Sequence, residues 1–412
     1  MDAGPVALGV RVALASRPVS LAARETPATQ GLLIIVAAFW LATLACGGAD
    51  FTPALVRLGA QVPARGEPWR LWSYAFLHGS WAHVGMNAYV LWRIGRPLER
   101  LLGTARFVVL YSLTALAGGL ATSLTLKGLS VGASGALWGL LGAEAVLVLG
   151  PRPTLPPSVA RKGRGVVAQN LILNAAISFL PRVNAAAHFA GGLTGALLML
   201  TVLAPGLPRW GEDESQPGRA PAWLAPLAWL SGSALVASAA IAVLAGRPWD
   251  LAAPGPTVEA RLPSGCVIAL PAQLRAQADR AAADPLVWGD LLRDPAIVMA
   301  TESPVDETAL DEVREHLDAL LSRRPEGTRI VEPPTRVQRS GLTVVEARYV
   351  HRTGSLWESA VVLIPGDTGG SAAEILRIDV LLHPGASGAW RGLATEVAAS
   401  ASPTGESPRV DR

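Results

Sequence analysis

The sequence has few charged residues and few cysteines. Asp, Glu, Lys and Arg make up 16% of the 412 residues, whereas 50% of the residues are hydrophobic. This balance excludes an ordinary soluble protein of this length and favours a membrane protein. The net charge is only +3 and no basic cluster occurs, so we expect no nucleic-acid partner. The two cysteines, Cys46 and Cys266, neither support nor exclude a disulfide.

Two arrangements common in hydrolytic sites are also missing. No H-E-x-x-H pattern occurs, and His78 and His83 are five residues apart, about 140° around a helix, which is a poor geometry for sharing one zinc ion. No pair of aspartates lies within the apolar segments, which argues against an acid pair in the membrane. We therefore expect neither a metal nor another cofactor.

Long apolar segments dominate the first 250 residues. Uncharged runs at 31–47, 107–126, 183–204 and 222–246 are each long enough to cross about 30 Å of hydrocarbon as a helix. Three weaker runs, at 81–98, 128–150 and 165–181, contain a few polar side chains. The sequence predicts an all-α polytopic helical bundle with six spans in 31–204, a cytoplasmic loop at 205–221 and a seventh span at 222–246.

The composition changes near residue 250, where charged residues and prolines reach soluble proportions. Helix-like spacing at 267–283 and 308–324 and alternating β-branched runs at 341–351, 358–364 and 375–382 predict a soluble α+β domain over 250–400. Residues 401–412 are short, polar and terminal, and we expect them to be disordered.

Lysine and arginine counts predict the orientation. With residues 1–30 as a cytoplasmic N-terminal segment, the inner segments hold thirteen such residues and the short outer loops hold five. An odd number of spans then makes the domain at 250–400 extracytoplasmic. We expect the first span to serve as an uncleaved signal, which places the protein in the cell membrane as a multi-pass protein.

Polar side chains inside apolar segments are costly, so each needs a partner or a role. His83 and Asn87 are four residues apart and therefore share one helical face. Ser134 lies among glycines in "SVGASGALWG", and His188 lies in "AAAHFAGGLTG". Small-xxx-small pairs in these two segments allow two helices to approach closely, which would bring His188 beside Ser134. These pairs are Gly135 with Gly139 and Gly191 with Gly195.

A serine beside a histidine can act as a nucleophile, because the neutral imidazole takes the hydroxyl proton. His83, Asn87 and the backbone N–H of Ser134 could donate to an oxyanion, and Gly132 would allow a tight turn before Ser134. A proton or ion pathway through the buried His, Asn and Glu144 remains an alternative. The polar residues of the spans at 81–98, 128–150 and 183–204 cluster toward the outer half of the membrane. This disfavours a continuous polar path across the bilayer.

Three motifs together resemble the signature of rhomboid intramembrane serine proteases. They are "HGSWAHVGMN", "GASGALWG" and "AHFAGGLTG", in that order, and the resemblance covers roughly residues 31–204. It implies Ser134 as the nucleophile and His188 as the general base, without an acid, and His83 and Asn87 as oxyanion donors. The segment at 222–246 and the domain at 250–400 lie outside the common six-span core.

The resemblance also implies supporting roles. Trp69 and Arg70 match a structural Trp-Arg pair in the first outer loop, and Glu99 matches an acid that braces neighbouring segments. Trp138 stands where a tyrosine often stacks on the catalytic histidine, and an indole can stack equally well. The remaining supporting residues are Gly132, Gly135, Gly139, Gly191 and Gly195.

The expected activity is cleavage of transmembrane protein substrates in the lipid bilayer near its outer face, with a small side chain before the cut. The alternative is a non-catalytic relative that binds transmembrane clients for trafficking or quality control. The sequence indicates no partner for the extracytoplasmic domain. Its simplest role would be packing or substrate docking.

Overall fold

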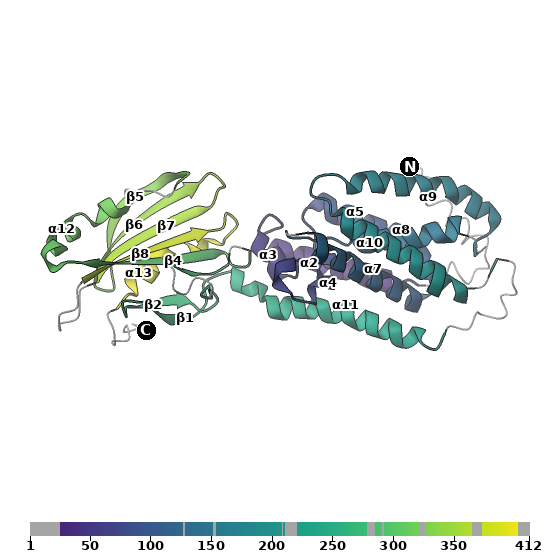
Figure 1. Ribbon diagram of the computed structural model, residues 1–412, viewed down its shortest axis with the longest axis horizontal. Helices are drawn as coiled ribbons and strands as arrows, with labels where there is room; N and C mark the ends of the chain where they lie inside the picture. The colour runs from purple at the N-terminus through teal and green to yellow at the C-terminus, as the bar shows by residue number, and fades with distance from the viewer. Residues whose placement is uncertain are drawn as a thin grey trace. The chain divides into compact units, whose positions relative to one another are not determined.

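The computed structural model describes residues 25–126, 128–150, 154–207, 209–210, 221–277, 285–290, 292–321, 326–364 and 373–402. The chain divides into two compact units, coloured by position along the chain in Figure 1. The helical unit comprises Met1–Ala45 and Leu55–Arg247, and the sheet unit comprises Cys46–Ala54 and Pro248–Arg412. Most of the expected N-terminal segment 1–30 and most of the expected tail 401–412 lie outside the described residues.

Helices of the helical unit follow the predicted apolar segments. They are α2 (Pro27–Ala45), α5 (Trp81–Val90), α6 (Arg96–Leu102), α7 (Thr104–Thr125), α8 (Ser134–Leu149), α9 (Pro157–Ser178), α10 (Ala185–Leu198) and α11 (Leu224–Gly246). Two π-helical turns, η3 (Leu91–Gly95) and η4 (Met199–Leu203), join α5 to α6 and lengthen α10. Short helices between the longer ones are α3 (Thr52–Arg57), η1 (Pro63–Arg65), α4 (Arg70–Ser73), η2 (Tyr74–Phe76) and η5 (Ala204–Gly206).

Four described helical segments are long and apolar enough to cross a membrane, which fits a multi-pass membrane protein. They are Pro27–Ala45, Thr104–Thr125, Ala185–Leu203 and Leu224–Leu251. The last of these contains α11, which coincides with the expected seventh span. That seven segments cross the bilayer stays a prediction.

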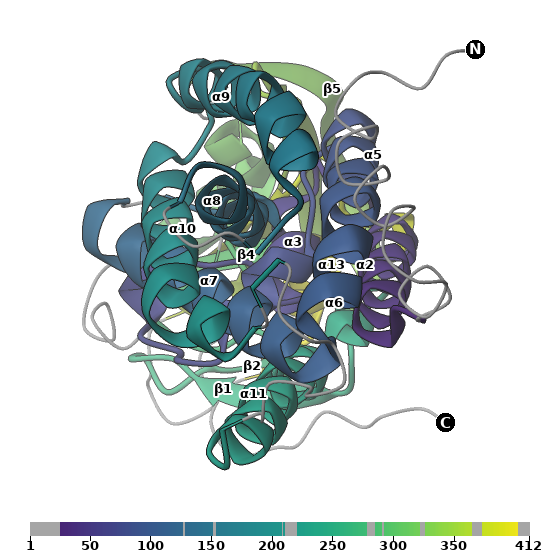
Figure 2. The ribbon, with the colours of Figure 1, turned by 90° about the vertical axis from the view of Figure 1, so that its right-hand side faces the viewer.

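Helix α8 is the most enclosed helix of the unit. Figure 2 looks along it and shows α7, α9 and α10 around it. Twelve of its 16 residues are buried, and most of them are glycine, alanine or leucine. Small side chains let the neighbouring backbones approach closely, so a helix with this composition can occupy the centre of a bundle. Ser134 is the first residue of α8.

The sheet unit contains a six-stranded antiparallel sheet with strand order β3-β4-β8-β7-β6-β5 and a separate hairpin (Figure 1). The hairpin strands are β1 (Thr257–Arg261) and β2 (Val267–Pro271), and the sheet strands are β3 (Leu286–Trp288), β4 (Ala296–Val305), β5 (Thr328–Arg339), β6 (Leu342–His351), β7 (Leu356–Ile364) and β8 (Ala373–Leu382). The helices are α12 (Leu310–Glu315), α13 (Leu393–Ala399), η6 (Pro248–Leu251), η8 (Glu307–Ala309), η9 (Leu317–Leu321) and η10 (Gly388–Trp390).

Alternating side chains place a core on each face of the sheet. Val344 packs in the cluster that contains α13, whereas the next residue, Val345, packs in the cluster that contains Leu317 and Leu321 of η9. This follows from the two-residue period of a strand, in which neighbouring side chains point to opposite faces. The sheet is therefore covered on both faces, as expected for an α+β domain.

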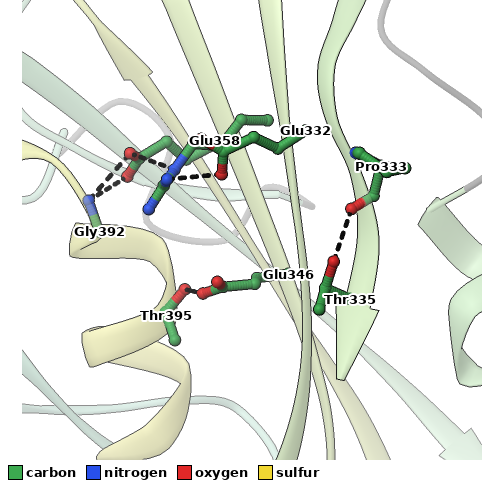
Figure 3. Close-up of polar contacts among 8 residues, drawn as sticks. Glu332, Pro333, Thr335, Glu346, Glu358, Gly392 and Thr395 are labelled. Atoms are coloured by element: carbon green, nitrogen blue, oxygen red, sulfur yellow. Dashed lines mark hydrogen bonds and ion pairs between the residues drawn. The ribbon is translucent and has the colours of Figure 1, made fainter. Parts of the chain in front are cut away.

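A buried carboxylate fixes the start of α13 on the sheet. Both carboxylate oxygens of Glu358 on β7 accept from the backbone N–H of Gly392 at 2.9 Å, and Arg348 Nε lies 3.2 Å from Glu358 Oε1 (Figure 3). One turn later, Thr395 donates to Glu346 of β6. These polar contacts hold α13 in register over β6 and β7.

The strands expected at 341–351, 358–364 and 375–382 are present as β6, β7 and β8. The expected helix at 267–283 was wrong, because Val267–Pro271 is a strand paired with β1 and residues 278–284 lie outside the described residues. Val267 and Ile268 are β-branched and pack best in a pleated sheet. The expected helix at 308–324 is broken at His316 into α12 and η9.

Candidate active site

Ser134 is presented by a glycine turn at the start of α8. Gly132, two residues earlier, has a φ of +125°, which L side chains rarely adopt. A Cβ on Gly132 would also lie 2.7 Å from His83 Nε2. The N–H of Gly132 donates to the Tyr74 carbonyl at 3.0 Å, which ties the turn to η2. Glycine is required here for both the backbone conformation and the close approach of His83.

His188 lies beside Ser134, as the sequence predicts. The distance from His188 Nε2 to Ser134 Oγ is 2.7 Å, a normal hydrogen bond, and the His188 side chain is buried. Asn184 caps α10 by accepting from the Ala187 N–H at 3.1 Å. Its amide nitrogen also donates to Thr122 at 2.8 Å and to Ser130 at 3.2 Å, so the first turn of α10 is fixed to α7 and to the loop before α8.

Glycines allow α8 and α10 to approach to backbone contact. A Cβ on Gly191 would lie 2.0 Å from the Gly135 carbonyl oxygen, and a Cβ on Gly195 would lie 2.0 Å from that of Gly139. No real side chain tolerates such a distance, so α10 can sit here only with glycine at these two positions. The predicted glycine pairs therefore meet each other across the helix pair that carries the serine and the histidine.

Gly135 and Gly139 of α8 face other neighbours. A Cβ on Gly139 would lie 2.3 Å from Thr114 on α7, and one on Gly135 would lie 3.2 Å from the hydroxyl of Tyr74 and from the Ala187 carbonyl oxygen. A bulky residue at Gly139 would thus push first against α7. The glycines that allow α10 to approach α8 are Gly191 and Gly195 on α10 and Gly142 on α8, whose Cβ would lie 2.2 Å from the Gly192 carbonyl oxygen.

Trp138 stacks on the histidine ring. The centroids of the Trp138 and His188 rings are 5.8 Å apart with an interplanar angle of 24°, and the Phe189 ring contacts the indole edge-on at a centroid distance of 5.5 Å. Trp138 lies one turn after Ser134 on α8. The indole therefore limits rotation of the imidazole about its side-chain bonds.

His83 and Asn87 approach the turn that precedes Ser134. Ser80 caps α5 by accepting from the His83 N–H at 3.2 Å, which orients the helix that carries both residues. A Cβ on Gly132 would lie 3.8 Å from Asn87 Nδ2. This amide nitrogen is buried and has no hydrogen-bond partner among the residues that the structure describes. His83 Nε2 and Asn87 Nδ2 thus both lie close to Gly132, in the turn that precedes Ser134.

Trp69, Arg70 and Glu99 lie away from the serine and hold loops and helix ends. The Arg70 guanidinium donates to the carbonyls of Val56 and Ala60, both at 2.7 Å, and stacks 4.2 Å from the Trp69 ring. The buried carboxylate of Glu99 accepts from Ala28 N, Thr29 N and Thr29 Oγ1 at the start of α2 and from Thr104 Oγ1 at the start of α7. Negative charge at a helix N-terminus is favourable, so Glu99 stabilises both helix starts.

The sequence did not single out two residues that contact the site. Ser178 Oγ, at the end of α9, lies 2.7 Å from His188 Nδ1, the ring nitrogen opposite the one that meets Ser134. Asn184, the cap of α10, carries a recognisable signal, because an asparagine before an apolar helical run is a preferred cap. Ser178 carries no such signal, since a serine ten residues before His188 in an apolar segment fits helix packing equally well.

Comparison with known proteins identifies the helical unit. Residues 65–205 match the Rhomboid domain family. The chain is 40% identical over 159 residues to RHOMBOID-like protein 5 of Arabidopsis thaliana, covering 37% of this chain and 50% of that protein. It is 33% identical over 168 residues to the rhomboid protease GluP of Bacillus subtilis, covering 40% and 32%, and 39% identical over 88 residues to the putative rhomboid protease YdcA of the same organism, covering 21% and 44%.

The matched regions span half or less of the length of these relatives, and all of the family match lies within the helical unit. The match includes the turn before Ser134, the first turn of α10 and the helix that carries His83 and Asn87. Residues 65–205 of the helical unit therefore match the Rhomboid domain, and the relatives named above are similar to part of the chain.

Proposed function

We propose that this chain is an intramembrane serine endopeptidase that cleaves transmembrane segments of other membrane proteins through Ser134 and His188. The observation that carries the proposal is the 2.7 Å contact between Ser134 Oγ and His188 Nε2, inside a bundle of apolar helices. A serine hydroxyl becomes a good nucleophile when a neighbouring neutral imidazole accepts its proton. Two relatives are named rhomboid proteases, which supports the same reaction.

The chemistry proceeds by acyl transfer. Ser134 Oγ attacks the scissile carbonyl carbon while its proton moves to His188 Nε2, and the carbonyl π electrons move to the oxygen. The imidazolium then gives its proton to the departing amine, which leaves an acyl-enzyme on Ser134. Water, deprotonated by His188, hydrolyses the ester and restores the serine.

The developing oxyanion needs donors that are in place before the reaction. His83 and Asn87 on α5 approach the turn that carries Ser134, and the Ser134 N–H lies at the N-terminus of α8, where backbone N–H groups have no intrahelical acceptor. The amide nitrogen of Asn87, which has no hydrogen-bond partner within the described part of the chain, fits such a role, because an incoming oxyanion would satisfy it.

The position of Ser134 on a short helix supports cleavage inside the bilayer. A helix of 16 residues is about 24 Å long, less than the ~30 Å of hydrocarbon, so α8 cannot reach both membrane surfaces, which is compatible with Ser134 at its end lying below the surface. The Lys and Arg distribution favours a cytoplasmic N-terminus, which puts Ser134 toward the outer face and makes the sheet unit extracytoplasmic. Substrate helices would have to unwind there, which favours substrates with helix-destabilising residues and a small side chain before the cut.

Labelling with a serine-directed fluorophosphonate tests the proposal. The native protein should be labelled and should cleave a transmembrane substrate, whereas Ser134→Ala should do neither. Ser238→Ala is the matched control, because Ser238 is a buried serine on α11 whose hydroxyl donates to the Leu235 carbonyl. Equal labelling of the native protein and Ser134→Ala would exclude Ser134 as the nucleophile. Client binding without cleavage, unaffected by His188→Ala, would favour a non-catalytic client-binding protein.

A further inference from the structure

The imidazole of His188 contacts a serine on each side. Its Nε2 lies 2.7 Å from Ser134 Oγ, and its Nδ1 lies 2.7 Å from Ser178 Oγ at the last residue of α9. Ser178 is 1% exposed, so its hydroxyl has to find its hydrogen-bond partners within the protein. Helices α9, which carries Ser178, and α10, which carries His188, both contact α8, and Figure 2 shows both next to it.

The partners of Ser178 assign its proton. A serine hydroxyl has one hydrogen to donate and lone pairs to accept with. Ser178 donates that hydrogen to the Asn174 carbonyl, one turn earlier on α9, at 2.8 Å. Its oxygen is then an acceptor toward His188, so the hydrogen in the 2.7 Å contact belongs to His188 Nδ1.

The tautomer of His188 follows from this assignment. A neutral imidazole with its hydrogen on Nδ1 has a free lone pair on Nε2, and that nitrogen faces Ser134. In the opposite tautomer, Nε2 would donate to Ser134 and could not take its proton. Ser178 would then have to turn its own hydrogen toward Nδ1 and give up the bond to Asn174. The three contacts are all satisfied at once only in the tautomer that suits a base.

We propose that Ser178 is a positioning residue that holds His188 with its hydrogen on Nδ1, so that Nε2 accepts the proton of Ser134. The proposal rests on the function proposed above. In serine hydrolases with a triad, a carboxylate does this work. Among the described residues, no carboxylate makes a hydrogen bond to His188, whereas the Ser178 hydroxyl occupies the position that a carboxylate would take.

The Ser178 hydroxyl keeps its own proton throughout the reaction. When Ser134 attacks, its proton moves to His188 Nε2 and the ring becomes an imidazolium that still donates from Nδ1 to Ser178. When the imidazolium protonates the leaving amine, the ring returns to the same neutral tautomer. A hydrogen bond to a charged ring is stronger than one to a neutral ring, so the contact stabilises the charged intermediate more than the resting state.

Two variants of matched shape separate the hydrogen bond from packing. Threonine and valine have nearly the same volume, and threonine in a helix donates to the carbonyl one turn earlier, as Ser178 does. In Ser178→Thr the acceptor for Nδ1–H remains, and we expect a kcat close to the native value. In Ser178→Val the acceptor is lost, and we expect kcat to fall roughly 10- to 100-fold with KM unchanged, the usual effect of removing a hydrogen bond to a charged group.

The measurement is steady-state cleavage of a fluorogenic transmembrane peptide by the detergent-solubilised full chain, with thermal unfolding of each variant recorded in parallel. A Ser178→Val that is much slower in kcat than an equally folded Ser178→Thr supports the proposal. Equal kcat in the two variants, whether both are fast or both are slow, overturns it, as does a change confined to KM.

Further variants separate this proposal from the proposed function. Ser178→Ala avoids the added volume and should lose kcat as Ser178→Val does, whereas Ser238→Ala should stay native. If Ser134→Ala still cleaves the peptide, the proposed function fails. If Ser134→Ala is inactive while Ser178→Val and Ser178→Ala keep the native kcat, the proposed function stands and the role of Ser178 is wrong.

Discussion

At the scale of residues, two buried polar side chains, Asn87 and Glu99, differ in how much of their hydrogen-bonding capacity is used. The amide nitrogen of Asn87 is buried and has no partner among the described residues, although an unsatisfied buried donor costs about 1 to 3 kcal/mol. Glu99, by contrast, is buried with four hydrogen bonds to two helix starts. We interpret this difference as one between a donor kept free for substrate and an acid used for stability.

Substitution of Asn87 tests this interpretation. Asn87→Ala should lower kcat by roughly 10²- to 10³-fold, the usual loss when an oxyanion donor is removed. It should leave the thermal unfolding midpoint nearly unchanged, because no described residue makes a hydrogen bond to Nδ2 that would be lost. Asn170→Ala on α9 is a control for loss of an amide in the same unit. Unchanged kcat in Asn87→Ala, measured with the fluorogenic peptide, would exclude the oxyanion role.

At the scale of elements, the helix pair α8 and α10 brings the serine and the histidine together through backbone contact. Gly191 and Gly195 of α10 face carbonyl oxygens of α8, and Gly142 of α8 faces the Gly192 carbonyl oxygen of α10. The other two α8 glycines, Gly135 and Gly139, face Tyr74, Ala187 and Thr114. The glycine pattern predicts that two helices approach closely. It does not predict which glycines meet carbonyl groups of the other helix, because that depends on the rotation of each helix about its axis.

A substitution in α10 tests the importance of this approach. The Cβ of Gly195→Ala would lie 2.0 Å from the Gly139 carbonyl oxygen, so α10 would have to move away from α8. We expect a large loss of cleavage activity and a lower unfolding midpoint. Gly165→Ala is the matched control, since nothing lies within 4 Å of a Cβ at that position of α9. There the replacement should raise helix stability by about 1 kcal/mol. Native activity in Gly195→Ala would contradict the packing described for this pair.

At the scale of the whole molecule, each of the two units is built from two segments that are separated in the sequence. The sheet unit contains Cys46–Ala54, which directly follow α2 in the sequence, as well as the residues after Pro248. Within this unit Phe51 is 2% exposed and packs against His383, with ring centroids 4.9 Å apart. The sequence placed these nine residues in the six-span core, because no change of composition separates them from the spans that flank them.

Removal of the Phe51 ring should therefore destabilise the sheet unit. Phe51→Ala leaves a cavity and should cost about 3 to 5 kcal/mol. Cys266 reports the effect, because burial, followed by the charges of Glu302 and Glu374, raises the pKa of its thiol to about 11. In the native protein at pH 8 the Cys266 thiol should resist maleimide, and in Phe51→Ala it should react faster.

Mass spectrometry of the labelled peptides separates Cys266 from Cys46, since both are free thiols. Val258→Ala is the control, because Val258 on β1 is 49% exposed. If Cys266 is labelled as slowly in Phe51→Ala as in Val258→Ala, Phe51 does not support the sheet unit.

The sequence by itself determined the helical class, the change to a sheet domain near residue 250, and the residues that meet at Ser134. The length of apolar segments, the composition and the short motifs are local properties, so they can be recognised without knowledge of the fold. The sequence did not determine that Val267–Pro271 is a strand, because β2 is defined by its pairing with β1. Nor did it identify Ser178, whose contact with His188 exists only because α9 ends beside α10. Contacts between segments depend on helix rotation and strand partners, which only the tertiary structure decided.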